Sequence, residues 1–254
     1  MRAFVEAWWR RLLGKDAQRP LSRAFVHRDW RGTELRFKAG TAQSRMSHWT
    51  PDRLVVDYTR TMLGALLLVP APARVGMIGL GGGSQVKFLH RHLRGARLEV
   101  FENDPEVIAL RRRFRIPDDD ARLAVHRADA AEVLPAWIGC FDLLLVDGYD
   151  VDGIPPALST PAFYADARAS LRSGGVMTVN LYDTAHAWHL QCLHDVFGAE
   201  SVFVVEEVLQ SNRVAFGWVP PLAAVGDDPA LTAAGRRELK DVFDRFRQFG
   251  AGRW

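Results

Sequence analysis

Residues 73–93 read ARVGMIGLGGGSQVKFLHRHL, and this stretch decides the fold. A short apolar run is followed by a loop rich in glycine and then by a helical pattern. Glycine carries no Cβ and tolerates positive φ, so a ligand can lie against backbone N–H groups at the start of the helix. We therefore expect Gly79, Gly81 and Gly82 to contact a nucleotide-like cofactor. The alternative is that these glycines serve only the geometry of the turn.

The chain after this loop alternates between strand-like and helix-like segments. Apolar runs typical of buried parallel strands occupy residues 73–79, 96–102, 122–126, 141–147 and 175–182. Helical patterns at 85–93, 105–114, 130–137 and 161–171 separate these runs, as right-handed crossover connections require. Two more strands, at 201–208 and 213–218, and two more helices, at 185–197 and 228–250, are expected. The predicted fold class is α/β, a doubly wound Rossmann-like sheet.

The N-terminal part has a different pattern. Residues 1–20 predict an amphipathic helix with Trp8 and Trp9 beside basic residues, which would pack on its own domain, a partner or a membrane surface. Residues 21–50 alternate around turn residues and predict a small β-hairpin region. A helix is expected over 52–68, and residues 51–254 are predicted to form the Rossmann-like catalytic domain.

Composition limits the partners and the location. The formal charge of +3 comes from scattered arginines, which argues against a nucleic-acid partner. The N-terminal segment has no long apolar stretch, so neither a signal peptide nor stable membrane insertion is expected. Cys140 and Cys192 lie far apart and form no CxxC motif, which favours the reducing cytoplasm.

Four acidic residues follow the predicted strands at their carboxyl ends. Glu102 ends the second strand about twenty residues beyond the glycine loop, where a carboxylate can accept both hydrogen bonds of a ribose diol. An NAD-dependent dehydrogenase would also fit this position, and the alternative is an exposed acid at the end of a strand. Asp129, Asp147 and Asp150 follow the third and fourth strands, so all four acids are expected to converge on one crevice. Asp129 is also a plausible helix N-cap, and for Asp104 we prefer that role.

Several motifs together resemble one family. IGLGGGSQVKF, VFENDPEVIAL, HRADAAEVL, VDGYD and SLRSGGVMTVNL, in this order, are similar to the spermidine synthase-like proteins, or polyamine aminopropyltransferases. The resemblance covers roughly residues 35–182. It implies the fold of S-adenosylmethionine-dependent methyltransferases with a small N-terminal β-domain, and a homodimer. The D-x-x-D tetrad from Asp147 to Asp150 is its most specific part.

The resemblance also implies a role for each site residue. Gln43 and Glu102 would hold the ribose, Asp129 and Ala130 would lie at the adenine, and Asp147 would bind the aminopropyl end of the donor. The donor would be decarboxylated S-adenosylmethionine or S-adenosylmethionine itself, and the acceptor a small amine. The catalytic pair would be Asp147 and Asp150, with Asp150 and Tyr58 facing the acceptor. A carboxylate can orient a protonated amine and accept its proton during attack, so no metal is expected.

The chain departs from the family pattern at four places, one of which is the region near Val208, where the family's late substrate tyrosine has no equivalent. Gly82 stands where the family loop has an aspartate that binds the donor. The segment Tyr58-Thr59-Arg60 replaces a motif that ends in an acid, and Tyr182-Asp183-Thr184 replaces Gln-Glu-Ser. Arg60 is either a surface residue or a partner for a substrate carboxylate. A methyltransferase and a nucleoside-binding homologue without activity therefore stay as alternatives to aminopropyl transfer.

Overall fold

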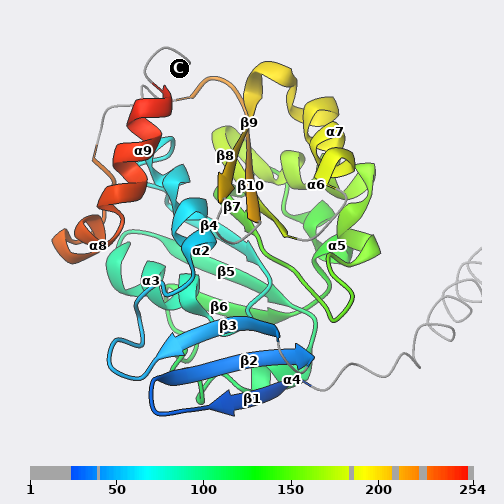
Figure 1. The fold of residues 1–254 in the computed structure, drawn as a ribbon. Helices are drawn as coiled ribbons and strands as arrows, with labels where there is room; N and C mark the ends of the chain where they lie inside the picture. The colour runs from blue at the N-terminus through cyan, green and yellow to red at the C-terminus, as the bar shows by residue number, and fades with distance from the viewer. Residues whose placement is uncertain (1–23, 39–40, 183–185, 208–211, 223–227, 251–254) are drawn as a thin grey trace, which may run out of the picture.

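The computed structural model describes residues 24–38, 41–182, 186–207, 212–222 and 228–250, with the side chains of 37–38, 41–43 and 249–250 left out. The helix predicted over residues 1–20 lies outside these ranges. Two sheets make up the framework: a small antiparallel sheet near the N-terminus and a large central sheet, with helices packed on both faces of the large one (Figure 1).

The N-terminal sheet has three strands, β1 (Phe25–Arg28), β2 (Gly32–Lys38) and β3 (Thr41–Ser47). All neighbouring strands are antiparallel, and the turn between β1 and β2 is closed by Asp29, whose side chain accepts the backbone N–H groups of Arg31 and Gly32. The predicted hairpin is thus present, and a third strand extends it. β3 is the strand that this sheet presents to the central domain, where it contacts α3 (Ser84–His92).

The central sheet has seven strands in the order β6-β5-β4-β7-β8-β10-β9. The strands are β4 (Arg74–Ile78), β5 (Arg97–Glu102), β6 (Leu123–Arg127), β7 (Phe141–Val146), β8 (Leu171–Tyr182), β9 (Val202–Glu207) and β10 (Asn212–Trp218). The first five are parallel, whereas β10 runs antiparallel to both β8 and β9. Chain order reverses between β4 and β7, so the sheet is doubly wound as predicted.

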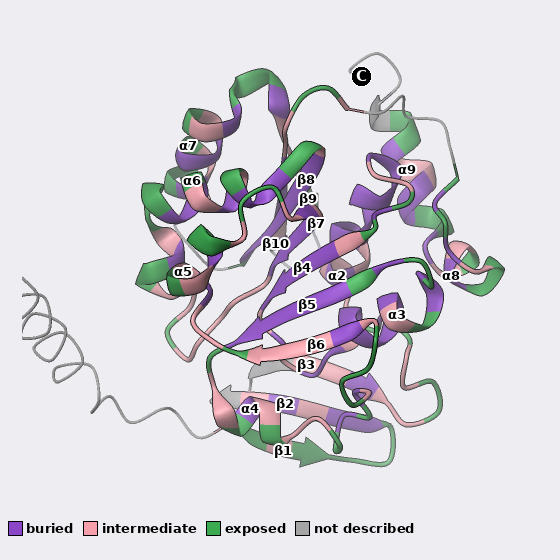
Figure 2. Ribbon diagram, turned by 180° about the vertical axis from the view of Figure 1, so that it is seen from behind, coloured by how far each residue is buried: buried purple, intermediate pink, exposed green. Residues whose placement is uncertain are grey.

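Both faces of this sheet are buried, which explains the continuous apolar runs in the sequence. Leu143 and Leu145 of β7 pack into one hydrophobic cluster, while Leu144 and Val146 of the same strand pack into the other. Figure 2 shows the middle strands as the buried part of the molecule and β1 as an exposed edge. Successive residues of β7 therefore face opposite sides of the sheet, and both sides are packed against hydrophobic side chains.

The helices cover the two faces in separate groups (Figure 1). One group comprises α5 (Ala130–Val133), η2 (Leu134–Ala136), η3 (Pro156–Ser159), α6 (Pro161–Ser170), α7 (His186–Phe197) and η4 (Ala199–Ser201). The other comprises α2 (Asp57–Met62), η1 (Leu63–Leu67), α3, α8 (Ala233–Glu238) and α9 (Lys240–Gly250), and the short α4 (Pro105–Ala109) follows β5. No helix among the described residues is long and apolar enough to cross a membrane.

The helix predicted over residues 52–68 is shorter in the structure. Its α-helical part begins only at Asp57, and a 3-10 segment follows from Leu63. The residue before it, Val56, is extended, with φ −102° and ψ 127°. Val55 and Val56 are β-branched and favour this extended conformation, which the apolar periodicity alone does not reveal.

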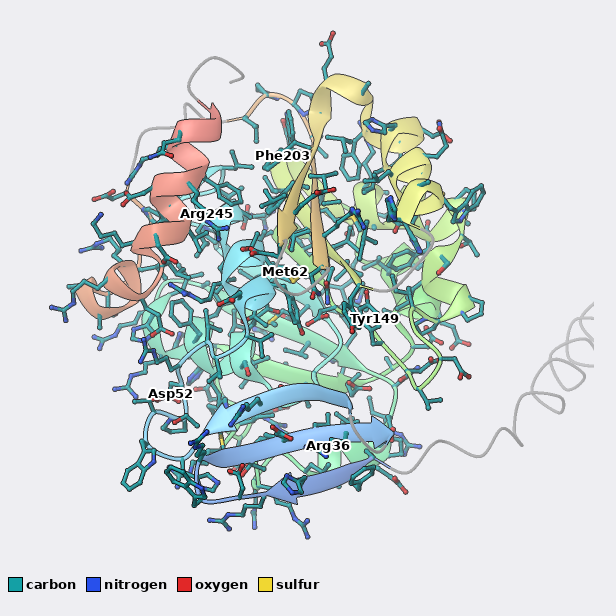
Figure 3. The ribbon with its side chains drawn as sticks, viewed as in Figure 1. Arg36, Asp52, Met62, Tyr149, Phe203 and Arg245 are labelled. Carbon is teal, nitrogen blue, oxygen red and sulfur yellow. The ribbon has the colours of Figure 1, made fainter. Side chains whose placement is uncertain are left out.

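The C-terminal helices hold α2 in place. Arg60 donates to the carbonyl oxygen of Glu238 over 2.7 Å and to the carboxylate of Asp241. Arg245 projects from α9 toward α2 (Figure 3), where it reaches the hydroxyl of Thr61 over 3.2 Å. At Gly64 an added Cβ would lie 2.4 Å from the Phe246 ring, so η1 and α9 are in direct contact.

Candidate active site

A cavity of about 430 Å³ opens at the carboxyl ends of β4 and β7, where the strand order reverses. This is the position at which open α/β sheets bind ligands. Its wall combines the glycine loop after β4, the ends of β5 to β8, the start of α3 and residues of α2 and β3. Of the eleven residues that the sequence predicts to form the site, nine belong to the described lining of the cavity, and the exceptions are Gln43 and Arg60.

The glycine loop needs its glycines for close packing as well as for turns. Gly79 has φ +93°, and a Cβ there would lie 2.2 Å from the backbone oxygen of Asp147. Gly81 and Gly83 also have positive φ, at +50° and +63°. Only glycine satisfies these positions without strain, and the loop backbone consequently lines the cavity. Gly79, Gly81 and Gly82 all belong to that lining, as the sequence predicts.

Glu102 braces the glycine loop from the end of β5. Its carboxylate accepts the backbone N–H of Leu80 over 2.9 Å and that of Asp104 over 2.9 Å. Burial raises the pKa of Glu102, while these backbone donors act in the opposite direction. The side chain lines the cavity, so it contributes both to the shape of the loop and to the polar surface offered to a ligand.

Asp104 and Asp129 are both helix caps. Asp104 accepts the N–H of Glu106 over 2.7 Å at the start of α4, and Asp129 accepts the N–H of Ala131 over 2.9 Å at the start of α5. The predicted capping roles are confirmed. Asp129 and its neighbour Ala130 also line the cavity, so the cap does not remove Asp129 from the ligand surface.

Asp147 is held by two neutral hydrogen-bond donors. The Tyr58 hydroxyl donates to its Oδ2 over 3.0 Å, and Asn180 Nδ2 donates to its Oδ1 over 2.9 Å. Asn180 in turn accepts from Nδ2 of Asn212 over 2.8 Å. The carboxylate is therefore fixed by α2 on one side and by β8 and β10 on the other.

This environment moves two pKa values upward. Burial raises the pKa of Asp147, and the donors Asn180 and Tyr58 oppose that shift by stabilising the carboxylate. Burial and the neighbouring Asp147 raise the pKa of Tyr58 well above its ordinary value. Tyr58 consequently remains a hydrogen-bond donor throughout the neutral range.

Asp150 lies on the loop after β7 and has a more open setting. Its backbone N–H bonds to the oxygen of Gly153 over 2.9 Å, and its Oδ1 accepts the N–H of Asp152 over 2.7 Å.

Tyr149, labelled in Figure 3, connects the same loop to β8, because its hydroxyl donates to the Asn180 oxygen over 2.9 Å and accepts the N–H of Tyr182 over 2.6 Å. Both aspartates of the tetrad thus line the cavity.

Sequence reasoning missed the polar residues that support the site. Asn180 and Asn212 are buried, and Gln85 is buried with its Nε2 bonded to the Thr59 oxygen over 3.2 Å. All three line the cavity. A signal for Asn180 existed in the sequence, since an amide in the otherwise apolar run of β8 needs a buried partner.

Gly82 has a specific neighbour that replaces the expected acid. A Cβ at this position would lie 2.5 Å from Oγ of Ser44 and 3.0 Å from the Phe114 ring. Ser44 comes from β3 and lines the cavity. The space that an aspartate side chain would enter from the loop is therefore occupied by a neutral hydroxyl from the N-terminal sheet.

Two predicted site residues stand apart from the others. Arg60 is not part of the cavity lining, because its guanidinium turns toward α8 and α9, so the structure does not bring it to a substrate carboxylate. The sequence cannot show this, since the partners of Arg60 lie about 180 positions away along the chain. The side chain of Gln43 lies outside the described residues.

The charge of the cavity wall is entirely acidic among the described residues. Five carboxylates line it: Glu102, Asp104, Asp129, Asp147 and Asp150. No lysine, arginine or histidine is part of the described lining. A cationic ligand is favoured in such a cavity, whereas a ligand carboxylate would find no cationic side chain there.

Comparison with known proteins agrees with this geometry. A polyamine aminopropyltransferase of Neisseria meningitidis serogroup B is 35% identical over 148 residues, which cover 58% of this chain and 56% of the relative. One from Chromobacterium violaceum is 34% identical over 166 residues, 64% of each chain. The chain is similar to the polyamine aminopropyltransferases. The matches span less than two thirds of the length of these relatives, and no family model matches the chain.

Solved structures show the same fold. A probable spermidine synthase of Corynebacterium glutamicum superimposes with a TM-score of 0.66 over 92% of this chain and 95% of that one, at 18% identity. Human methyltransferase-like protein 13, in complex with SAH, gives a TM-score of 0.60 at 20% identity, over 76% of this chain and 93% of that one. An eEF1A lysine and N-terminal methyltransferase of Xenopus laevis is 32% identical over 164 residues, 57% of this chain and 24% of that protein. The fold that the aminopropyltransferase resemblance implies is thus confirmed.

Proposed function

We propose that this protein transfers an aminopropyl group from decarboxylated S-adenosylmethionine to a small amine and releases methylthioadenosine. The wholly acidic wall of the described cavity carries this proposal. The decarboxylated donor is cationic at its sulfonium and at its terminal amine, and an amine acceptor is cationic at neutral pH because its pKa resembles that of lysine. Both substrates match the charge of the cavity.

The same observation favours the decarboxylated donor over S-adenosylmethionine. The additional carboxylate of S-adenosylmethionine would enter a region with five acids and no described cationic side chain. The like charges would repel one another more strongly in a cavity than in bulk water. Arg60, which the sequence offered as a partner for such a carboxylate, binds Asp241 instead.

Each predicted site residue can be assigned to one part of the two substrates. Glu102 and Gln43 are proposed to bind the ribose, Asp129 and Ala130 the adenine, and Asp147 the aminopropyl ammonium group. Tyr58 and Asp150 are proposed to face the acceptor amine. Because Asp147 already accepts bonds from Tyr58 and Asn180, its carboxylate needs little rearrangement when the ammonium group arrives.

Asp150 is proposed as the base. The protonated acceptor amine first gives one proton to the Asp150 carboxylate, which leaves its nitrogen with a free electron pair. That pair forms the bond to the aminopropyl carbon attached to sulfur, and the C–S bond breaks with its electron pair returning to sulfur. The sulfonium thereby becomes the neutral thioether of methylthioadenosine, and the alkylated amine leaves as an ammonium ion. Asp150 suits this step because its setting is more open than that of Asp147, so the proton can then leave to solvent.

A methyltransferase acting with S-adenosylmethionine is the second candidate. Gly82 favours it, since the loop lacks the donor-binding acid, and so does the likeness to methyltransferases. Calorimetric titration with both donors distinguishes the two. We expect the decarboxylated donor to bind more tightly, and a clear preference for S-adenosylmethionine would favour methyl transfer.

The activity itself is tested with the full chain, decarboxylated S-adenosylmethionine and a panel of diamines and polyamines. Methylthioadenosine and the alkylated amine should appear in equal amounts. Failure to form methylthioadenosine with any amine would refute the proposal. A cytoplasmic location and a homodimer are further proposals: both free cysteines suit a reducing compartment, and gel filtration with light scattering tests the dimer.

A further inference from the structure

A second hollow, of about 470 Å³, lies away from the acidic cavity and has the opposite charge. It is lined by Asp52, Lys87, His90, Arg91, Arg94, Pro117 and Arg122. Four lysine and arginine side chains thus face one lining acid, and the two linings share no residue. In Figure 3, Asp52 beside this hollow and Tyr149 at the cavity are well separated across the molecule.

Two of these cationic side chains, Lys87 and Arg122, are held by hydrogen bonds to backbone oxygens and carry further N–H donors. Lys87 is only 2% exposed, and its Nζ donates to the Phe114 oxygen over 2.8 Å. An ammonium group has three N–H donors, so two remain for a ligand in the hollow. Burial lowers the pKa of Lys87 to about 8, and a bound anion would favour its charged form.

Arg122 adds a second preformed donor. One of its guanidinium nitrogens donates to the His90 oxygen over 2.8 Å, which fixes the group in the wall. The other terminal nitrogen, Nη1, is buried and has no hydrogen-bond partner within the described structure. A buried guanidinium N–H without an acceptor is costly, and an anion in the hollow would remove that cost.

Three side chains that are more exposed, His90, Arg91 and Arg94, complete the basic lining of the hollow. His90 bonds to Asp120 over 2.9 Å, Arg91 pairs with Asp52, and Arg94 is exposed beside them. Basic residues at the C-terminal end of a helix can simply complement its dipole. The helix dipole does not explain Lys87, which lies inside α3, or Arg122, which precedes β6 on a separate segment.

We propose that this hollow binds the phosphate group of a small molecule, with Lys87 and Arg122 as the central ligands and Arg91 and Arg94 at its rim. A compact dianion suits two fixed donors better than a monoanion does, and guanidinium groups match phosphate oxygens in geometry. The site is independent of the proposed transfer reaction, because it shares no residue with the acidic cavity.

The test is isothermal titration calorimetry of the full chain at low ionic strength with inorganic phosphate, pyrophosphate and glycerol 3-phosphate, and with chloride as reference anion. Saturable binding of one phosphate compound per chain is expected. Comparison of the three ligands distinguishes free phosphate from a phosphate ester. Absence of saturable binding with all three would overturn the proposal.

Four variants locate the binding. Arg94→Gln, which changes an exposed side chain, and Arg122→Gln should each weaken phosphate affinity by about tenfold. Arg172→Gln, a matched change at the start of β8, should alter it by less than about twofold, since its ion pair with Asp142 is exposed. Asp52→Asn should strengthen binding by about threefold, because it removes the lining acid and frees Arg91.

The opposite directions of these effects make the result decisive. A misfolded variant would weaken binding, so a gain with Asp52→Asn cannot come from unfolding. If Arg172→Gln weakens binding as much as Arg94→Gln does, the anion responds only to overall charge and the proposal is wrong. It is equally wrong if phosphate binds but Arg94→Gln and Arg122→Gln leave the affinity unchanged.

Discussion

The hydroxyl of Tyr58 donates a hydrogen bond to Oδ2 of Asp147 over 3.0 Å, and so joins α2 to the end of β7. The two residues are 89 positions apart in the sequence. This bond couples the acidic centre of the cavity to a short helix that the C-terminal helices hold in place. The ionisation of Asp147 therefore depends on elements far from the tetrad in which it occurs.

Replacement Tyr58→Phe should shift the pH dependence of the transfer reaction. The lost bond stabilises the carboxylate, so the pKa of Asp147, already raised by burial, should rise further. A smaller fraction of Asp147 is then ionised at low pH, and the acid limb of the kcat/KM profile should move upward by about one pH unit. Methylthioadenosine release measured from pH 5 to 9 checks this.

Tyr164→Phe serves as the control for that shift. Tyr164 is also buried and its hydroxyl bonds to His189 over 2.7 Å, but it does not line the cavity. Its loss should lower the melting temperature without moving the pH profile. A profile unchanged in Tyr58→Phe would contradict the role given to the Tyr58 bond.

The variant Asp150→Asn should slow the transfer step while leaving nucleoside binding nearly unchanged. The amide cannot accept the proton of the acceptor amine, so kcat should fall by a factor on the order of 10²–10⁴. Affinity for methylthioadenosine, measured by calorimetry, should change little. The matched variant Asp118→Asn, at an exposed residue outside the cavity, should retain full turnover. A fully active Asp150→Asn enzyme would show that another group accepts the proton.

Replacement of Arg60 tests whether the C-terminal helices hold α2 in its position. Arg60→Ala removes the bonds to Glu238 and Asp241 and should lower the free energy of unfolding by about 1–3 kcal/mol. Since α2 carries Tyr58, kcat should fall while KM for the donor changes little, and the acid limb of the pH profile should move in the same direction as in Tyr58→Phe. Arg60→Lys should restore part of kcat.

The control here is Arg213→Ala, which removes an ion pair between β10 and Glu206 at the protein surface. It should affect neither the pH profile nor kcat, because exposed ion pairs contribute little. A pH profile that stays fixed in Arg60→Ala would indicate that the arginine stabilises the fold without acting on Tyr58.

The sequence predicts the central sheet well because its middle strands are buried on both faces and three of the connecting helices, α4, α5 and α6, begin at capping residues. Asp104 caps α4 as the sequence predicts, and Thr160 caps α6 directly before Pro161. Glu102, Asp129, Asp147 and Asp150 meet at one edge because parallel strands end there. The partners of Arg60 and the contact of Ser44 with Gly82 depend on tertiary packing between distant segments, which local patterns do not encode.

The contact between Ser44 and Gly82 leads to a prediction about donor recognition. Gly82→Asp alone should weaken binding of the donor, because its Cβ would lie 2.5 Å from Oγ of Ser44 and force β3 away from the loop. The double variant Ser44→Gly/Gly82→Asp removes that obstruction and adds a carboxylate facing the cationic donor. It should bind decarboxylated S-adenosylmethionine about tenfold more tightly than Gly82→Asp does, by calorimetry. Ser44→Gly alone should gain no affinity, and a double variant no better than Gly82→Asp would show that Ser44 does not determine which residue fits at position 82.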